Sequence, residues 1–398
     1  MTLANVLRQV RDNRHFDLAS VARFAQISPA RLKEIESGVR EPSFKQLQRL
    51  AEAYGVPDYI LGAGGLPNLP EQQILDFRKR APRPARLSPE AMQRIWATEQ
   101  AVVFTTQIWG ALELALPSWS KEVPTGKPNT KIAGLLRHYF DDWFAERRAG
   151  LQLSGTADQT FFAGLRIFLE ALGIIVRVND APADEFLGFF LADRESFGSI
   201  FVNRRTLAPK AQLFTLVHEV AHLMINANDG ARGGVSDPFK LNNQIEQTCN
   251  RFAAEFLAPD EIFRAAVELV GRSDRADVFR FVDSVAQHSL LSKFATAIRL
   301  RETDYITQEQ LVRWTAARAT MTRKQLKDEE SDASGETFGA PHAKRIGEVG
   351  YLPTYVAKVA VEKKLIDFAD VTASISISRG LQDRAFSLAA RRMEVAVR

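Results

Sequence analysis

The segment His218-Glu219-Val220-Ala221-His222 holds the side chains whose types and spacing most clearly indicate chemistry in this sequence. Residues four positions apart lie on one face of a helix, so the imidazoles of His218 and His222 can reach the same metal ion. Glu219 lies about 100° further round the helix than His218, close enough to act on a water molecule beside that ion. The pattern predicts a metal site in which Glu219 is a general base and the metal polarises a scissile carbonyl group.

A third ligand is expected from the segment Glu246-Gln247-Thr248-Cys249-Asn250, which begins 24 residues after His222. Glu246 and Asn250 share a helix face, so Glu246 can complete a two-histidine, one-carboxylate set and Asn250 can accept a hydrogen bond from a ligating imidazole. Glu246 could instead be a solvated carboxylate that binds no metal. Cys249 could be a softer metal ligand, although a small buried residue is the simpler interpretation. These donors favour one Zn²⁺ per chain, although manganese or another divalent ion could occupy such a site.

The composition limits the classes of protein that this chain can represent. It has 398 residues, a formal net charge of +4 and one cysteine. A single cysteine excludes a disulfide scaffold, a cysteine-based zinc finger and an iron–sulfur cluster, and it fits a reducing compartment. The sequence has no apolar run of the ~18 residues that a membrane helix needs and no apolar secretory segment at its N-terminus. We therefore expect a cytoplasmic protein without a membrane partner, whose small net charge does not by itself indicate nucleic acid.

The elements that must position these residues follow from apolar periodicity and turn residues. Residues 1–62 have apolar positions three and four apart in four stretches, with helix starts at Ser28-Pro29 and at Ser43. Residues 63–150 combine a Gly- and Pro-rich linker with two long helices that are separated by a break at Pro117–Pro128. Residues 266–398 are expected to be helical, with a polar loop at Lys324–Phe338.

Residues 151–265 have a different character, because strand patterns occur among the helices. After a helix at about Ala157–Leu172, three strands are predicted, at Ile174–Val178, Phe186–Ala192 and Ser199–Asn203. The remainder consists of a helix over Pro209–Asn226, a Gly-rich loop over Asp229–Gly234 and a helix over Asn242–Leu257. The order predicts a mostly helical α+β fold: a small α+β domain between an all-α N-terminal domain and a helical C-terminal region.

Several short segments around the HExxH motif form a further pattern: Gly188-Phe189, Ile200–Asn203, Phe214–Val217, Leu223, Phe252–Glu255 and Leu257-Ala258-Pro259. Together they resemble the ImmA/IrrE family of zinc metallopeptidases over about residues 155–265, and Phe279–Leu300 resembles the helical region that follows this core. The resemblance implies a zincin-like domain with zinc ligands His218, His222 and Glu246 and catalytic Glu219. Cys249 stands where alanine is usual and Ala258 where methionine is frequent, and neither departure removes a metal ligand.

This resemblance also implies a partner. Family members cleave a specific protein, often a helix-turn-helix repressor, so we expect a protein substrate that is a helix-turn-helix regulator encoded nearby. An extended substrate segment could add to the sheet edge at Phe186–Ala192 or Ser199–Asn203 and so pass over the metal.

The N-terminal helices resemble an XRE-type helix-turn-helix domain through Val21-Ala22, Ile27-Ser28, Leu32, Ile35-Glu36, Gly38, Arg40 and Pro42-Ser43. The helix from Ser28 would enter the major groove of DNA, where Lys33 and Glu34 can reach base edges. Arg31, Arg40 and Lys45 can contact phosphates, which position the domain without reading sequence. Because so few side chains can read bases, a protein-docking role is the alternative to DNA binding. The basic stretch Arg78–Arg86 either adds phosphate contacts or is a solvated linker.

The sequence therefore predicts a zinc-dependent endopeptidase fused to a DNA-binding domain, which cleaves a partner regulator to control transcription. The alternative is a transcription regulator or antitoxin-like binding protein whose metal site is structural or sensory. The complete set of His218, Glu219, His222 and Glu246 favours the enzyme, because a remnant site would not need Glu219. A homodimer is compatible with both.

Overall fold

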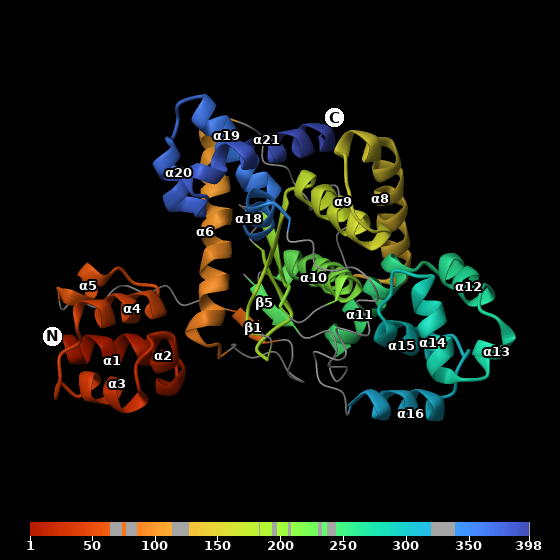
Figure 1. Ribbon diagram of the computed structural model, residues 1–398, viewed down its shortest axis with the longest axis horizontal. Helices are drawn as coiled ribbons and strands as arrows, with labels where there is room; N and C mark the ends of the chain where they lie inside the picture. The colour runs from red at the N-terminus through yellow and green to blue at the C-terminus, as the bar shows by residue number, and fades with distance from the viewer. Residues whose placement is uncertain are drawn as a thin grey trace. The chain divides into compact units, whose positions relative to one another are not determined.

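The computed structural model of the chain describes residues 1–63, 74–76, 86–113, 127–182, 184–192, 197–205, 208–229, 233–236, 244–319 and 339–397. The chain divides into two compact units, of which the first comprises Met1–Ile74 with Pro84–Glu99 and the second Leu75–Arg83 with Gln100–Arg398 (Figure 1). The predicted loop at 324–338 lies outside the described residues, as does most of the predicted linker, of the break at 117–128 and of the basic stretch at 78–86.

The first unit is built from helices, two of which begin at the predicted residues Ser28-Pro29 and Ser43. The helices are α1 (Leu3–Asn13), α2 (Leu18–Phe24), α3 (Pro29–Glu36), α4 (Phe44–Tyr54), α5 (Asp58–Gly62) and the part of α6 (Pro89–Ala111) up to Glu99. The Ser28 hydroxyl accepts a hydrogen bond from the Arg31 N–H, and Ser43 with Gln46 forms a full capping box. The apolar faces of these helices are buried together, with Val6, Val21, Leu32 and Leu50 fully enclosed. Local caps and periodicity therefore suffice to define this unit.

The second unit contains the other helices of the described residues. Those before and around the sheet are α8 (Thr130–Leu151), α9 (Ala157–Ala171), α10 (Pro209–Asp229) and α11 (Gln244–Leu257). Those that follow are α12 (Asp260–Glu268), α13 (Arg272–Arg275), α14 (Val278–Gln287), α15 (Lys293–Glu302), α16 (Gln308–Ala319), α18 (Pro341–Val349), α19 (Tyr351–Glu362), α20 (Phe368–Ile375) and α21 (Arg379–Ala396). In this described part, no helix has both the length and the apolar character that a membrane span requires.

The sheet, of which β2 to β5 lie wholly in the second unit, has the strand order β1-β5-β3-β4-β2. Its strands are β1 (Ile74–Asp76), β2 (Ile174–Asn179), β3 (Gly188–Leu191), β4 (Gly198–Asn203) and β5 (Gly233–Ser236). β2 and β4 are parallel, with Val176 opposite Ile200, and β3 is antiparallel to both β4 and β5. The predicted mostly helical α+β fold and its three strands are thereby confirmed.

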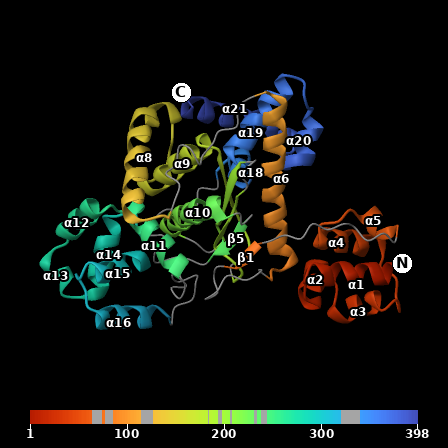
Figure 2. The same cartoon turned by 180° about the vertical axis from the view of Figure 1, so that it is seen from behind.

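Both faces of β2 are covered, which explains why its residues are almost uniformly buried. Alternate side chains point to opposite faces of a strand. Val176 packs in the large core with α9 and α10, whereas Ile175 packs with Leu352 and Val356 of α19. Helix α10 packs against β3 and β4, α11 against α10, and α8 against α9 (Figures 1 and 2). The C-terminal helices thus form one packed body with the sheet.

Two expectations are wrong. Part of the predicted Gly-rich loop is strand β5, because Gly233–Ser236 pairs with Leu191–Gly188 of β3. As a result, β3 is bonded on both sides, and so is β4. Neither offers the free edge at Phe186–Ala192 or Ser199–Asn203 that was expected to receive a substrate strand, because their backbone groups are already paired within the chain.

Candidate metal centre

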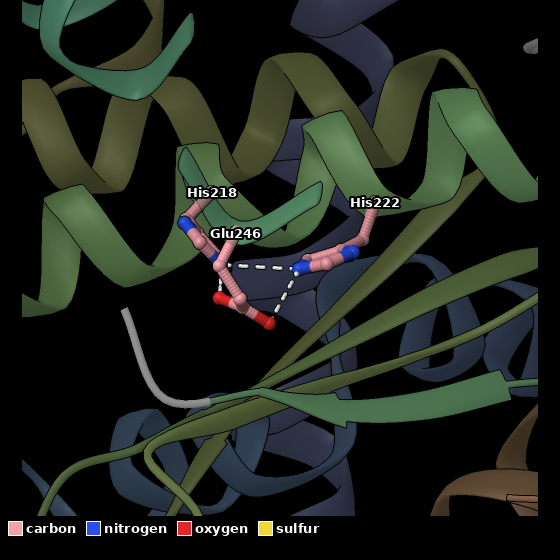
Figure 3. A group of neighbouring side chains, drawn as sticks. All are labelled: His218, His222 and Glu246. Carbon is pink, nitrogen blue, oxygen red and sulfur yellow. Dashed lines mark hydrogen bonds and ion pairs between the residues drawn. The ribbon is translucent and has the colours of Figure 1, made fainter. Parts of the chain in front are cut away.

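Helix α10 presents His218 and His222 on one face, as their spacing predicts (Figure 3). Both side chains are fully buried, and their Nε2 atoms lie 3.1 Å apart. An aromatic ring flanks each imidazole: Phe190 stacks on His222 at 5.7 Å between centroids, and Phe214 on His218 at 6.4 Å. These apolar neighbours fix the orientation of the rings and exclude water from one side of each.

Helix α11 brings Glu246 to the same point. One carboxylate oxygen lies 3.0 Å from Nε2 of His218 and the other 3.4 Å from Nε2 of His222 (Figure 3). One ligand atom from each of the three residues can be chosen so that all lie within 4.8 Å of one another. The carboxylate is fully buried, so the alternative of a solvated Glu246 is wrong.

These three residues fit a metal ion. The buried oxygens of Glu246 meet the Nε2 atoms of the two imidazoles at ion-pair distance, but without the geometry of a regular hydrogen bond. Buried polar atoms normally have partners, because leaving them without any costs several kcal/mol in the most apolar surroundings. Two imidazole nitrogens and a carboxylate that converge in the interior are a donor set that zinc accepts, and other divalent ions accept it too.

The charges of the group favour an ionised Glu246 and a neutral His222, whereas His218 is shifted toward its protonated form. Burial alone would lower the pKa of His218, but the carboxylate of Glu246 beside it outweighs burial and raises that pKa. Burial lowers the pKa of His222. Burial would raise the pKa of Glu246, but the facing histidines outweigh it and lower that pKa. An ionised carboxylate and a neutral imidazole are the protonation states in which these groups bind metals.

Glu219 is fully buried directly after His218, and strand β3 passes close beside it. A Cβ atom on Gly188 would lie 2.7 Å from a carboxylate oxygen of Glu219 and 2.7 Å from Cγ2 of Thr215. Real Cβ contacts are essentially never this short. A side chain at this position would therefore require Glu219 or Thr215 to shift. The resemblance included Gly188, but nothing in the sequence alone explained why glycine is needed there.

Two neighbours of Glu246 on α11, Cys249 and Asn250, were considered as further residues of the metal centre. Cys249 is buried outside the group of converging ligand atoms, and burial raises the pKa of its thiol well above its usual value. This agrees with a small buried residue and not with a thiolate ligand. Asn250 lies near enough to contribute to the raised pKa of His218, but its amide makes no hydrogen bond of regular geometry. Its role as an acceptor from the imidazole stays a prediction.

The predicted DNA-contacting residues lie in the other unit and differ in exposure. Lys33, Arg40 and Lys45 are exposed. Arg31 is partly buried and donates to the backbone oxygen of Glu41 at 2.9 Å. Glu34 lies near both arginines, 3.5 Å from Arg31 and 3.7 Å from Arg40. Arg31 and Glu34 are therefore engaged within the domain, and the contacts of all five residues with DNA stay predictions.

Two family models match the chain. Residues 169–301 match the IrrE N-terminal-like domain of the peptidase M78 family, and residues 7–61 match a helix-turn-helix domain. The two resemblances expected from the sequence are thereby confirmed. The chain has no match among curated proteins and none among solved structures.

Proposed function

Because the chain joins a helix-turn-helix domain to an IrrE N-terminal-like domain of a peptidase family, we propose that it is a metal-dependent endopeptidase that cleaves a partner regulator. The observation that carries the proposal is the convergence of His218, His222 and Glu246 in the interior, with Glu219 adjacent to the first of them. The proposed metal is zinc, one ion per chain. The proposed substrate is a helix-turn-helix regulator encoded nearby, whose removal changes transcription.

The residues of the metal centre would have separate roles in peptide hydrolysis. When bound, a divalent ion at His218, His222 and Glu246 supplies Lewis-acid chemistry, which polarises a carbonyl group and makes water more acidic. Glu219 would accept a proton from the attacking water as its oxygen bonds to the carbonyl carbon. Glu219 would then deliver that proton to the amide nitrogen as the C–N bond breaks. The apolar rings of Phe190 and Phe214 lower the local polarity, which strengthens each charge interaction relative to water.

The test compares the full-length protein with its Glu219→Gln variant, each produced together with the adjacent gene product. We expect the variant to keep about one metal ion per chain, because the ligands are intact. We expect its cleavage rate to fall by about 100- to 10,000-fold, the range for a lost general base. Cleavage is followed by mass spectrometry and metal content by elemental analysis.

Glu261→Gln is the matched control, since Glu261 is exposed on α12 and lies outside the metal centre. It should cleave at the wild-type rate. If Glu219→Gln keeps the wild-type cleavage rate, Glu219 is not the general base; if the wild-type protein does not cleave its partner, or the variant keeps the regulatory phenotype without cleavage, the endopeptidase proposal is wrong. The alternative function, a regulator whose metal site is sensory or structural, would then be favoured.

A further inference from the structure

A pocket of about 220 Å³ lies between helices α11 and α15. Its apolar lining is formed by Phe214, Ala254, Phe294, Ala295 and Ile298. Sites for small-molecule ligands usually measure about 300–1,000 Å³, so this pocket is small for a cofactor. Its size and its lining suit a single large apolar side chain.

The pocket lies next to the metal centre, because two of its lining residues are on the helices that carry the candidate ligands. Phe214 lies one helical turn before His218 and stacks on its imidazole, with 6.4 Å between ring centroids. Asn250 also lines the pocket, one turn after Glu246. Four residues of helix rise by about 6 Å, so these two lining residues are each one turn from a candidate ligand. An extended chain advances by ~3.3–3.6 Å per residue, so this is the distance of one or two residues.

The charges around the pocket restrict what it can hold. Buried Arg299 is paired with Glu255 at 2.8 Å and stacks over Phe263, so its charge is already compensated. At the exposed side, Arg251 lies 3.7 Å from Glu302, which joins the two helices by an ion pair. A charged ligand side chain would have to compete with these pairs, whereas an apolar one gains from leaving water.

We propose that this pocket receives an apolar side chain of the protein substrate, of the size of leucine, methionine or phenylalanine, within two residues of the scissile bond. The pocket would thereby select the cleavage site in the substrate. The proposal rests on the endopeptidase function proposed above and adds the specificity of that same site. Ile298 is the specificity-determining residue, since it lines the apolar wall and is partly exposed there.

The test uses full-length, zinc-loaded protein and a synthetic library of twelve-residue peptides randomised at every position. Binding is measured by affinity selection on proteins that carry Glu219→Gln, and cleavage is measured on proteins that keep Glu219. Mass spectrometry identifies the peptides in both experiments. Ile298→Trp should fill the pocket and Ile298→Ala should enlarge it. Ile262→Ala is the matched control, because Ile262 is exposed on α12 and lines no part of the pocket.

In proteins that keep Ile298, the bound and the cleaved peptides should share a leucine, methionine or phenylalanine at one position. Ile298→Trp should weaken this preference by about tenfold or more, the effect expected for a pocket that loses its side chain. Ile298→Ala should shift the preference towards phenylalanine, which keeps the test valid if the tryptophan variant does not fold. Ile262→Ala should leave the preference unchanged.

The outcomes separate the two proposals. If peptides bind with the apolar preference but none is cleaved, the pocket proposal is supported and the endopeptidase proposal is contradicted. If peptides are cleaved with the same preference in both Ile298 variants and in wild type, the pocket proposal is overturned and the enzyme stands. The absence of any selective binding by the full-length protein also overturns the pocket proposal.

Discussion

At the scale of single residues, the position of Glu219 depends on Gly188 in the neighbouring strand. Because a Cβ atom there would lie 2.7 Å from the Glu219 carboxylate, Gly188→Ala should push that carboxylate away from its place beside the ligands. We expect kcat for a cleaved peptide to fall by about tenfold or more, since a misplaced catalytic group loses much of its effect. KM and the metal content should change much less, because the atoms nearest to that Cβ belong to Glu219 and Thr215 and not to a ligand or a pocket residue.

A second glycine provides the control for this substitution. Gly134 in α8 has open space where its Cβ would lie, so Gly134→Ala should leave kcat unchanged and slightly favour the helix. Steady-state kinetics on the same peptide measure both variants. Wild-type kcat in Gly188→Ala would contradict the view that β3 limits the position of Glu219.

The metal centre illustrates what a sequence can predict about single residues. The geometry of His218 and His222 is local, since it follows from four residues of helix. Glu246 was predictable because it lies in the next helix of a small domain. The stacking of Phe190 and Phe214 on the imidazoles was not predictable, because it depends on how a strand and a helix pack. The pocket at Ile298 was missed for the same reason.

At the scale of elements, one buried carboxylate connects helix α9 to α19. Glu170 on α9 accepts a hydrogen bond from the Leu352 N–H at 2.6 Å, and Arg166 lies 3.9 Å away. Gly350 leaves space for this contact, because a Cβ there would lie 3.1 Å from the carboxylate. Arg177 of β2 adds a second link by donating to the backbone oxygen of Glu348 at 2.7 Å. The C-terminal helices are therefore held to the sheet by specific polar bonds as well as by apolar contacts.

Glu170 should make the stability of this unit depend on pH. Its burial raises the pKa from 4.5 to about 7, although Arg166 and the Leu352 bond oppose the shift. Between these two values the folded state binds the proton more tightly than the unfolded state, so the contribution is complete below pH 4.5 and is lost as pH rises through about 7. We expect the free energy of unfolding to fall by up to about 3 kcal/mol across this window, at about 1.4 kcal/mol per pKa unit.

The measurement is urea unfolding at several pH values for wild type and Glu170→Gln. The amide of glutamine can still accept the Leu352 hydrogen bond but cannot ionise, so the variant should lose this part of the pH dependence. The difference between the two proteins isolates Glu170 from other titrating groups. Parallel pH profiles would show that Glu170 does not stay protonated in the folded protein.

The elements also show where prediction from sequence ends. Helices such as α9, with its Thr156–Gln159 capping box, can be predicted because caps and periodicity are local. β5 overlaps the predicted Gly-rich loop, since Gly233 and Gly234 indicate a turn unless their pairing with β3 is known. The same pairing removed the sheet edge that was expected to bind substrate. The packing of α18 and α19 on β2 joins residues more than 170 positions apart, as Arg177 and Glu348 show, and no periodicity reports such contacts.

At the scale of the whole molecule, the chain combines a helix-turn-helix domain with a peptidase-family domain in separate compact units. The net charge of +4 is too small to decide whether the first unit binds DNA. The local arrangement is more informative. Arg31 and Glu34 make contacts within the domain and Arg40 is paired with Glu34 at 3.7 Å, whereas Lys33 and Lys45 are exposed on α3 and α4. Phosphate contacts are therefore expected mainly from these two lysines.

This expectation can be measured through salt dependence. Each phosphate contact to duplex DNA contributes about 0.9 to the slope of log affinity against log salt concentration, because it releases counterions. For the full-length protein and a 30-base-pair duplex of random sequence, the double variant Lys33→Ala with Lys45→Ala should lower the magnitude of this slope by about 2 and weaken binding at low salt.

Lys363→Ala is the control, since Lys363 is exposed beyond the end of α19 in the other unit, and it should leave the slope unchanged. Fluorescence anisotropy between 50 and 200 mM salt gives both quantities, over a range in which phosphate contacts strongly affect affinity. If the double variant binds DNA with the wild-type slope, these lysines do not contact phosphate, and protein docking becomes the better explanation for the exposed face of α3.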